Sequence, residues 1–360
     1  MRRGTRRSGN GRRGWRRPPA VALQRRLLKA AVGLPGPARR RLAGEPLEID
    51  GRRLDERMQI LTRLATARAP RSFDVETMRR GEAELVALAA EDPRPDVAVH
   101  DRTIEGPAGP LPVRLYHPPA AVDRAPGIVW FHMGGWVIGS LATSHALCTR
   151  LAHRVGAVVM SVDYRLAPEH RFPAQLDDGL AAVSWMIANA DALGVDPHRV
   201  AVGGGSAGGT LTAVVCQQRR RRDEPQPAAQ ILVYPLTDWR ARGGSLDSCA
   251  ACFPLGTGLV EWFRAQALPD EAAADDERAS PGRSSELWGL APAVVVTAGF
   301  DPLRDQGLAY ARALEQAGVP VRVRCEDALP HAFTIFGGLV PEARRATERL
   351  VDDVADVLGA

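Results

Sequence analysis

The pattern of apolar and polar positions along the chain changes near residue 97. Before that point, one segment repeats apolar side chains at three- and four-residue spacing, namely Leu54, Met58, Leu61 and Ala65. This spacing places apolar side chains on one face of a helix. Asp74, a residue type that caps helix N-termini, precedes a second such segment. We therefore expect residues 20–96 to be a helical region.

After residue 97, short β-branched runs alternate with helical stretches, a pattern typical of an α/β sheet. We predict eight strands, over residues 97–104, 113–116, 127–131, 157–164, 200–204, 230–234, 293–298 and 321–325. The later runs are apolar throughout, as in parallel strands buried on both faces. Helices are predicted over 177–189, 207–219, 304–317 and 341–358. The prediction is one α/β core over 97–360, with residues 240–288 as an insertion over the sheet edge.

Composition indicates a globular protein, because the 360 residues are 45% hydrophobic and 25% charged. No run approaches the roughly 18 to 20 apolar residues of a transmembrane helix, so we expect no transmembrane segment. The formal net charge is +5, but eight arginines between Arg2 and Arg17 contribute +8. The remainder is slightly acidic, so no nucleic-acid partner is expected. We predict residues 1–19 to be a disordered Arg-rich tail; contact with anionic lipid or nucleic acid is the alternative.

The five cysteines are odd in number and lack the spacing of a disulfide framework. Cys249 and Cys252 are separated by two residues, but no second pair or nearby histidine completes a zinc site. We therefore expect no metal, no cofactor and a cytoplasmic location. The sequence does not indicate an oligomeric state.

Residues 204–208 read Gly-Gly-Ser-Ala-Gly and match the Gly-x-Ser-x-Gly nucleophile elbow. The motif stands between a predicted strand and a predicted helix, which is where the elbow belongs. Glycine-rich turns of this kind also bind phosphate, but no P-loop lysine or dinucleotide-binding spacing follows. Ser206 is therefore the candidate nucleophile.

The other candidate groups also follow predicted strands. Asp301 follows the strand 293–298, and His331 follows the strand 321–325, which gives the order Ser, Asp, His of α/β hydrolases. His331 would act as the base and Asp301 would orient it. Three other acids are rivals for the role of Asp301, namely Asp305, Glu326 and Asp327. Asp301 is preferred because it lies nearest the carboxyl end of its strand.

Together these segments resemble the bacterial hormone-sensitive-lipase-like carboxylesterases. The resemblance rests on residues 132–136, 163–170, 204–209, 298–305 and 331–333, and it extends from about residue 97 to the C-terminus. It implies an α/β-hydrolase fold with a mostly parallel eight-stranded sheet flanked by helices. It also implies a cap over an acyl pocket, built mainly from residues 20–96, with 240–288 inserted on the cap side. The oxyanion hole would map to the amides of Gly134, Gly135 and Ala207.

The resemblance implies a serine carboxylesterase that cleaves small-molecule esters of short to medium acyl chain through an acyl-enzyme. The alternative is a weak or inactive binding protein on the same scaffold, as in plant gibberellin receptors, which lack the catalytic histidine. The presence of His331 argues against it. Three residues depart from the family pattern: Met133 and Ala332 replace usual glycines, and Gly205 replaces a usual aspartate.

Overall fold

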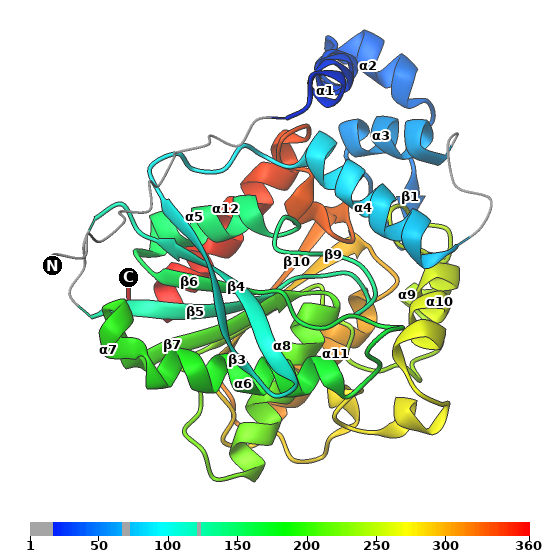
Figure 1. Ribbon diagram of the computed structural model, residues 1–360. Coiled ribbons are helices and arrows are strands. Elements are labelled where there is room, and N and C mark those ends of the chain that lie inside the picture. The colour runs from blue at the N-terminus through cyan, green and yellow to red at the C-terminus, as the bar shows by residue number, and fades with distance from the viewer. Residues whose placement is uncertain (1–16, 67–72, 121–123) are drawn as a thin grey trace, which may run out of the picture.

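The computed structural model describes residues 17–66, 73–120 and 124–360, and an eight-stranded sheet forms its centre (Figure 1). The strand order is β10-β9-β8-β7-β5-β6-β4-β3. The strands are β3 (Ala98–Gly106), β4 (Gly109–His117), β5 (Ala125–Phe131), β6 (Val158–Val162), β7 (Val195–Gly205), β8 (Gln230–Val233), β9 (Ala293–Phe300) and β10 (Val321–Pro330). Only β4 pairs antiparallel, with β3 and β6. The predicted eight strands and the α/β-hydrolase sheet are confirmed.

Both faces of the central strands β5, β6, β8 and β9 are buried because these strands are apolar at consecutive positions, whereas the edge strands β3 and β10 are largely exposed. In β5, Ile128 and Trp130 join one core cluster, whereas Val129 and Phe131 join the other. This alternation follows from the two-residue period of a strand. Figure 1 shows α5 (His145–Val155) and α12 (Pro341–Val357) on one face, with α6 (Ala174–Ala188), α8 (Ala207–Arg221) and α11 (Arg304–Gln316) on the other. The short α7 (Ala190–Leu193) precedes β7.

The four predicted helices of the core are present, within a few residues of their expected ends. The sequence prediction missed α5. Its apolar positions are interrupted by charged and polar ones, and its buried face includes Cys148 and Thr149. Tertiary packing thus buries residues that a hydrophobic pattern alone does not select.

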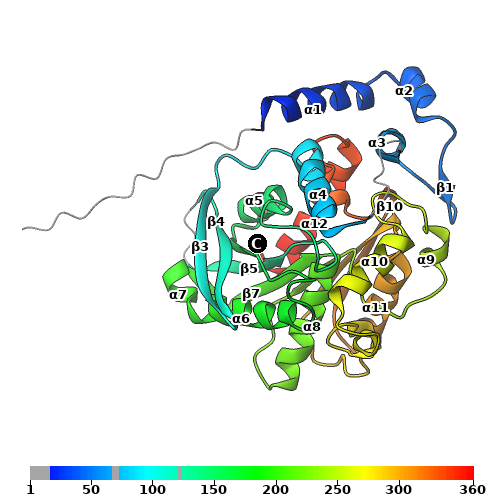
Figure 2. The ribbon, with the colours of Figure 1, turned by 45° about the vertical axis from the view of Figure 1, so that its right-hand side comes forward.

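The N-terminal region forms α1 (Pro19–Val32), α2 (Gly36–Ala43), α3 (Glu56–Thr66) and α4 (Val75–Ala89) above the sheet (Figure 2). Asp74 caps α4 and accepts a hydrogen bond from the Thr77 amide at 2.8 Å. A small hairpin, β1 (Glu48–Ile49) and β2 (Arg52–Arg53), interrupts the helices. Its turn residues Asp50 and Gly51 have φ of 52° and 72°, and an Asp-Gly pair is a hairpin signal that the helical prediction overlooked.

The described residues begin at Arg17, inside the expected tail of residues 1–19. Arg17 Nε donates a hydrogen bond to the Ala87 carbonyl at 2.7 Å, and α1 begins at Pro19. Residues 1–16, on which the prediction of a disordered tail falls, lie outside the described residues. Within the described ranges, no helix is both long and apolar enough to cross a bilayer.

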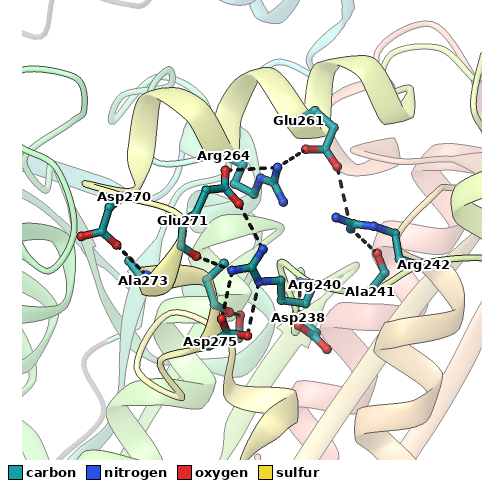
Figure 3. Close-up of polar contacts among 12 residues, drawn as sticks. Asp238, Arg240, Ala241, Arg242, Glu261, Arg264, Asp270, Glu271, Ala273 and Asp275 are labelled. Atoms are coloured by element: carbon teal, nitrogen blue, oxygen red, sulfur yellow. Dashed lines mark hydrogen bonds and ion pairs between the residues drawn. The ribbon is translucent and has the colours of Figure 1, made fainter.

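The insertion at 240–288 carries α9 (Ser245–Ser248), α10 (Thr257–Ala267) and two 3₁₀ turns, η1 (Ala272–Asp275) and η2 (Pro281–Arg283). The remaining 3₁₀ turn, η3 (Phe333–Ile335), follows β10. Figure 3 shows the ion pairs that connect these parts: Arg240 pairs with Glu271 at 3.0 Å and with Asp275 at 2.9 Å, and Arg264 pairs with Glu261 at 2.9 Å. Arg242 also pairs with Glu261 of α10 at 3.9 Å, and Arg264 of α10 pairs with Glu271 at 3.4 Å, so the network ties α10 to the chain on both sides of it.

Candidate active site

Ser206 lies at the sharp turn between β7 and α8, with φ 54° and ψ −121°. A non-glycine residue in this region is strained, which is typical of a nucleophile elbow. The neighbouring glycines are required by space, because a Cβ on Gly204 would lie 2.4 Å from the Gly208 carbonyl carbon. A Cβ on Gly208 would lie 2.2 Å from the Phe131 carbonyl oxygen. The small residues of the motif thus permit a tight turn that holds the serine at the end of the strand.

His331 and Asp301 complete a hydrogen-bonded chain with this serine. His331 Nδ1 lies 2.8 Å from Asp301 Oδ2, and His331 Nε2 lies 3.0 Å from Ser206 Oγ. A carboxylate only accepts, so Nδ1 carries the proton of the neutral ring and Nε2 accepts from the serine hydroxyl. Asp301 is fully buried, and its Oδ1 also accepts the Leu303 amide at 2.8 Å. The three predicted residues therefore meet, although Ser206 and Asp301 are 95 residues apart in the sequence and Asp301 and His331 are 30 residues apart.

The rival acids face other partners. Asp305 accepts the Ser245 amide at 2.8 Å and pairs with Arg304 at 2.9 Å. Glu326 pairs with Arg349, and Asp327 pairs with Arg52 at 2.6 Å. Only Asp301, of these four acids, contacts His331.

The loop after β5 holds the expected oxyanion donors beside the serine. Gly134 and Gly135 have φ of 127° and 61°, and neither amide donates a hydrogen bond to another described residue. Ala207 is the first residue of α8, where the amides have no partner within the helix. Trp136 Nε1 donates to the Ala207 carbonyl at 2.9 Å and ties the loop to the elbow. All three expected donors line one pocket with Ser206 and His331.

His132 is a buried support of this loop. Its ring stacks on Tyr164 with centroids 4.2 Å apart, and its Nδ1 lies 2.8 Å from the Met133 carbonyl. Burial lowers the pKa of His132 to about 4, only partly opposed by this hydrogen bond. The ring is thus neutral at pH 7 and donates to the carbonyl.

The three departures from the family pattern have different structural consequences. Met133 is not among the described non-glycine residues with positive φ, so its backbone carries no left-handed strain, and its side chain lines the pocket. Ala332 does adopt the left-handed conformation, with φ 59° and ψ 24°, which costs about 1 kcal/mol or more. A Cβ on Gly205 would lie 3.0 Å from the Tyr234 ring. That ring packs against His331 with centroids 4.8 Å apart.

The pocket has a volume of about 620 Å³ and is walled by two helices far apart in sequence. Helix α4 contributes Met78 and Leu85, and α10 contributes Val260 and Phe263. Phe263 also covers the oxyanion loop, because a Cβ on Gly135 would overlap its ring. The sequence prediction placed this segment in an insertion over the sheet edge and named no pocket residue in it; apolar residues at helical spacing inside an acid-rich insertion were the available signal.

A second residue that sequence reasoning missed is Arg79, which fastens α4 to the core. Its Nε donates to the Val137 carbonyl at 2.9 Å, and Nη2 donates to the Ala167 carbonyl at 3.0 Å. The guanidinium also pairs with Glu169 at 2.7 Å and lowers the pKa of that carboxyl to about 2. Arg79 thus attaches the cap helix α4 to the segment 163–170, which is one of the segments that carry the family resemblance.

Within the described residues, no group of three or more His, Cys, Asp or Glu side chains could hold a metal ion. Cys249 and Cys252 lie beside one another, and the hydrogen bond from Cys252 lowers the pKa of the Cys249 thiol. No third metal-ligating side chain joins them in the part of the chain that the structure describes.

Comparison with known proteins agrees with the fold. Residues 128–335 match the model of a family described by the alpha/beta hydrolase fold. The chain is 39% identical to the carboxylic ester hydrolase LipN of Mycobacterium tuberculosis, covering 85% of this chain and 84% of that protein. It is 37% identical to an ethyl acetate hydrolase of Pseudomonas putida, covering 77% and 88%. A solved esterase of Pyrobaculum calidifontis matches with a TM-score of 0.78 and 36% identity, over 85% of this chain and all of that one.

The fold and the arrangement of the site define an α/β hydrolase. Within that class, the chain belongs to the bacterial hormone-sensitive-lipase-like carboxylesterases, a family of carboxylic ester hydrolases.

Proposed function

We propose that this chain hydrolyses uncharged carboxylic esters of short to medium acyl chain, with Ser206 as nucleophile, His331 as base and Asp301 as the orienting acid. The hydrogen-bonded chain from Ser206 Oγ through His331 to Asp301 carries the proposal. The named activities of the relatives support the reaction class. The apolar walls and the volume of about 620 Å³ support a short to medium acyl group.

In the proposed acylation, Ser206 Oγ attacks the carbonyl carbon while His331 Nε2 takes its proton. Asp301 keeps Nδ1 protonated and stabilises the imidazolium that forms. The negative charge on the carbonyl oxygen is met by the amides of Gly134, Gly135 and Ala207, which have no competing partner among the described residues. When the tetrahedral intermediate collapses, His331 gives its proton to the leaving alcohol.

Deacylation repeats these steps with water. His331 removes a proton from the water that attacks the acyl carbonyl, and the same proton returns to Ser206 Oγ as the carboxylic acid leaves. The reaction needs only groups that the site contains. An inactive binding protein on the same scaffold is not favoured, because every element of the acid–base chain is present.

The test is hydrolysis of a p-nitrophenyl ester series, from acetate to octanoate, by purified protein. We predict that Ser206→Ala, Asp301→Asn and His331→Ala each lower kcat by several orders of magnitude without unfolding the protein, and that their effects are not additive. Asp305→Asn is the matched control for the acid and should keep at least the greater part of the activity. Substantial activity in Ser206→Ala would contradict the nucleophile assignment.

A further inference from the structure

The outer face of α1 carries apolar side chains that nothing in the described chain covers. Leu23 is 60% exposed and Leu27 is 63% exposed, and exposed Ala20 and Ala30 extend the same line. The spacing of three, four and three residues places all four on one side of the helix. We call this line the α1 stripe. Six of the nine large apolar side chains exposed among the described residues lie between positions 23 and 73.

The opposite face of α1 is attached to the molecule by polar contacts. Arg25 is buried, and its Nη1 donates to the Leu88 carbonyl at 2.7 Å and to the Ala90 carbonyl at 2.6 Å. These carbonyls lie at the C-terminal end of α4, where a helix lacks internal donors. The orientation of α1 is therefore fixed, and the α1 stripe points outward, away from α4. Figure 2 shows α1 lying along the outside of the molecule.

Basic residues are concentrated in the part of the sequence that contains the α1 stripe. Residues 1–66 hold 18 basic and 5 acidic residues, so they carry +13, whereas residues 67–360 hold 29 basic and 37 acidic residues and carry −8. Arg26 on α1 and Arg40 and Arg41 on α2 are exposed. None of the three forms an ion pair with an acid in the described ranges, whereas Arg39 on α2 pairs with Glu56 and many arginines of the core also form ion pairs.

We propose that α1 and α2 form a docking surface for an anionic lipid bilayer. An amphipathic helix binds in the plane of a membrane when it combines outward leucines with flanking basic side chains. The leucines of the stripe would enter the boundary between head groups and acyl chains, while the exposed arginines contact the lipid phosphates. The seven arginines between Arg2 and Arg16 would add to that attraction, because they directly precede this surface in the sequence.

Two other occupants fit the surface less well. A second copy of the chain would bring two strongly positive regions together, which is repulsive at the ionic strength of a cell. A nucleic acid would satisfy the arginines, but its phosphates offer no partner for Leu23 and Leu27. A bilayer with anionic head groups satisfies both the charge and the apolar stripe.

The test is flotation of the full-length protein with vesicles of phosphatidylcholine containing 30% phosphatidylglycerol, beside vesicles of phosphatidylcholine alone. We expect binding to the anionic vesicles at least about tenfold stronger than to the neutral ones, and weaker binding as salt rises. Leu23→Ser/Leu27→Ser should lower the partition coefficient about tenfold or more. Val99→Ser/Val323→Ser, which removes exposed apolar side chains from the two edge strands, is the matched control and should bind like the wild type.

Esterase turnover on p-nitrophenyl acetate checks that each variant is folded, since the α1 stripe lies outside the pocket residues. Three results from the vesicle and sedimentation measurements would each overturn the proposal. These are no preference for anionic vesicles, equal binding by the Leu23/Leu27 variant, or a dimer in sedimentation that this variant abolishes without any vesicle binding. Deleting residues 2–16 should weaken vesicle binding and leave the requirement for the leucines intact. Binding of an oligonucleotide in place of vesicles would likewise assign the surface to another partner.

Discussion

At the residue scale, the positive-φ backbone conformations of the oxyanion loop occur at Gly134, Gly135 and Trp136. Their φ values are 127°, 61° and 62°, whereas Met133 is outside the positive-φ set of the described residues. A methionine at 133 is therefore compatible with the loop, and its effect falls on the pocket that its side chain lines. The flexible thioether fills space that an acyl chain would otherwise occupy.

We predict that Met133→Gly raises kcat/KM by a factor that grows with acyl length, because removing the side chain enlarges the pocket without freeing a strained backbone. The measurement is kcat and KM on acetate, butyrate and octanoate esters. Met133→Leu keeps the volume and should give a profile close to that of the wild type. A uniform gain on all three esters would indicate strain, and a loss on all of them would contradict both accounts.

The buried ring of His132 predicts how the stability of the folded protein depends on pH. Its pKa is lowered by burial from about 6.5 to about 4, so between these values the unfolded chain binds a proton that the folded chain does not. Stability is therefore fully present above pH 6.5 and falls as the pH drops toward 4. Between pH 7 and pH 5 the loss attributable to His132 is about 2 kcal/mol.

Urea unfolding of the wild type and of His132→Asn at pH 7 and pH 5 measures this loss. The asparagine amide retains a donor for the Met133 carbonyl but does not titrate. The variant should be less sensitive to the pH change by about 2 kcal/mol. Equal sensitivity of the two proteins would show that folding does not lower the pKa of this ring.

At the element scale, the pocket depends on two helices that are fastened from outside it. The ion pairs of Figure 3 hold α10 through Arg264 and its neighbours in the insertion. Arg79 holds α4 through two backbone carbonyls and Glu169. Surface ion pairs contribute little singly, but the carbonyl contacts of Arg79 are to a charged donor and are worth more.

Arg79→Met should therefore lower the free energy of unfolding by about 1 to 2 kcal/mol and raise KM more than it lowers kcat, because the cap wall loosens while the triad is untouched. Denaturant unfolding and ester kinetics measure the two effects. Arg80→Met is the matched control for stability, since Arg80 is exposed and its nearest carboxylate, on Glu76, is 3.8 Å away. Similar losses of unfolding free energy from both substitutions would show that Arg79 stabilises the protein no more than an exposed arginine does.

At the scale of the whole molecule, Arg17 is the first of the N-terminal arginines that lies among the described residues. Arg17 donates to the carbonyls of Ala87 and Ala90 at the end of α4 and pairs with Asp92. The arginines of residues 1–16 directly precede it in the sequence.

Deletion of residues 2–16 is predicted to leave turnover on soluble esters and the free energy of unfolding unchanged. Arg17→Ala in the full chain should lower the free energy of unfolding by about 1 to 2 kcal/mol, because the Ala87 carbonyl loses its arginine donor and Asp92 loses its ion pair, while the Ala90 carbonyl keeps Arg25. Deletion through residue 95 should abolish activity, since it removes the α4 wall of the pocket. Thermal melts and p-nitrophenyl acetate hydrolysis compare the three variants with the wild type. A lower melting temperature after deletion of residues 2–16 would contradict the prediction that Arg17, and not the residues before it, contributes to stability.

The sequence by itself determined the features that are local or repeated along one strand. Parallel strands buried on both faces must be apolar at consecutive positions, which made β5, β6, β8 and β9 predictable. The edge strands β3 and β10 are largely exposed and were predicted from their β-branched runs instead. Strand β7 begins five residues before its expected start. The elbow was predictable because its tight turn excludes any Cβ at Gly204 and Gly208. Asp74 marked the start of α4 because capping is a contact between near neighbours.

Only the tertiary structure decided what depends on distant segments meeting. The pairing of β9 with β10 brings Asp301, and none of the three rival acids, to His331. The pocket joins Met78 of α4 to Phe263 of α10, which no sequence spacing relates. The outward direction of Leu23 and Leu27 depends on Arg25 reaching the end of α4, about 63 residues further along the chain. Such contacts follow from the packing of the whole chain, because their energies depend on burial and partners that a local pattern does not contain.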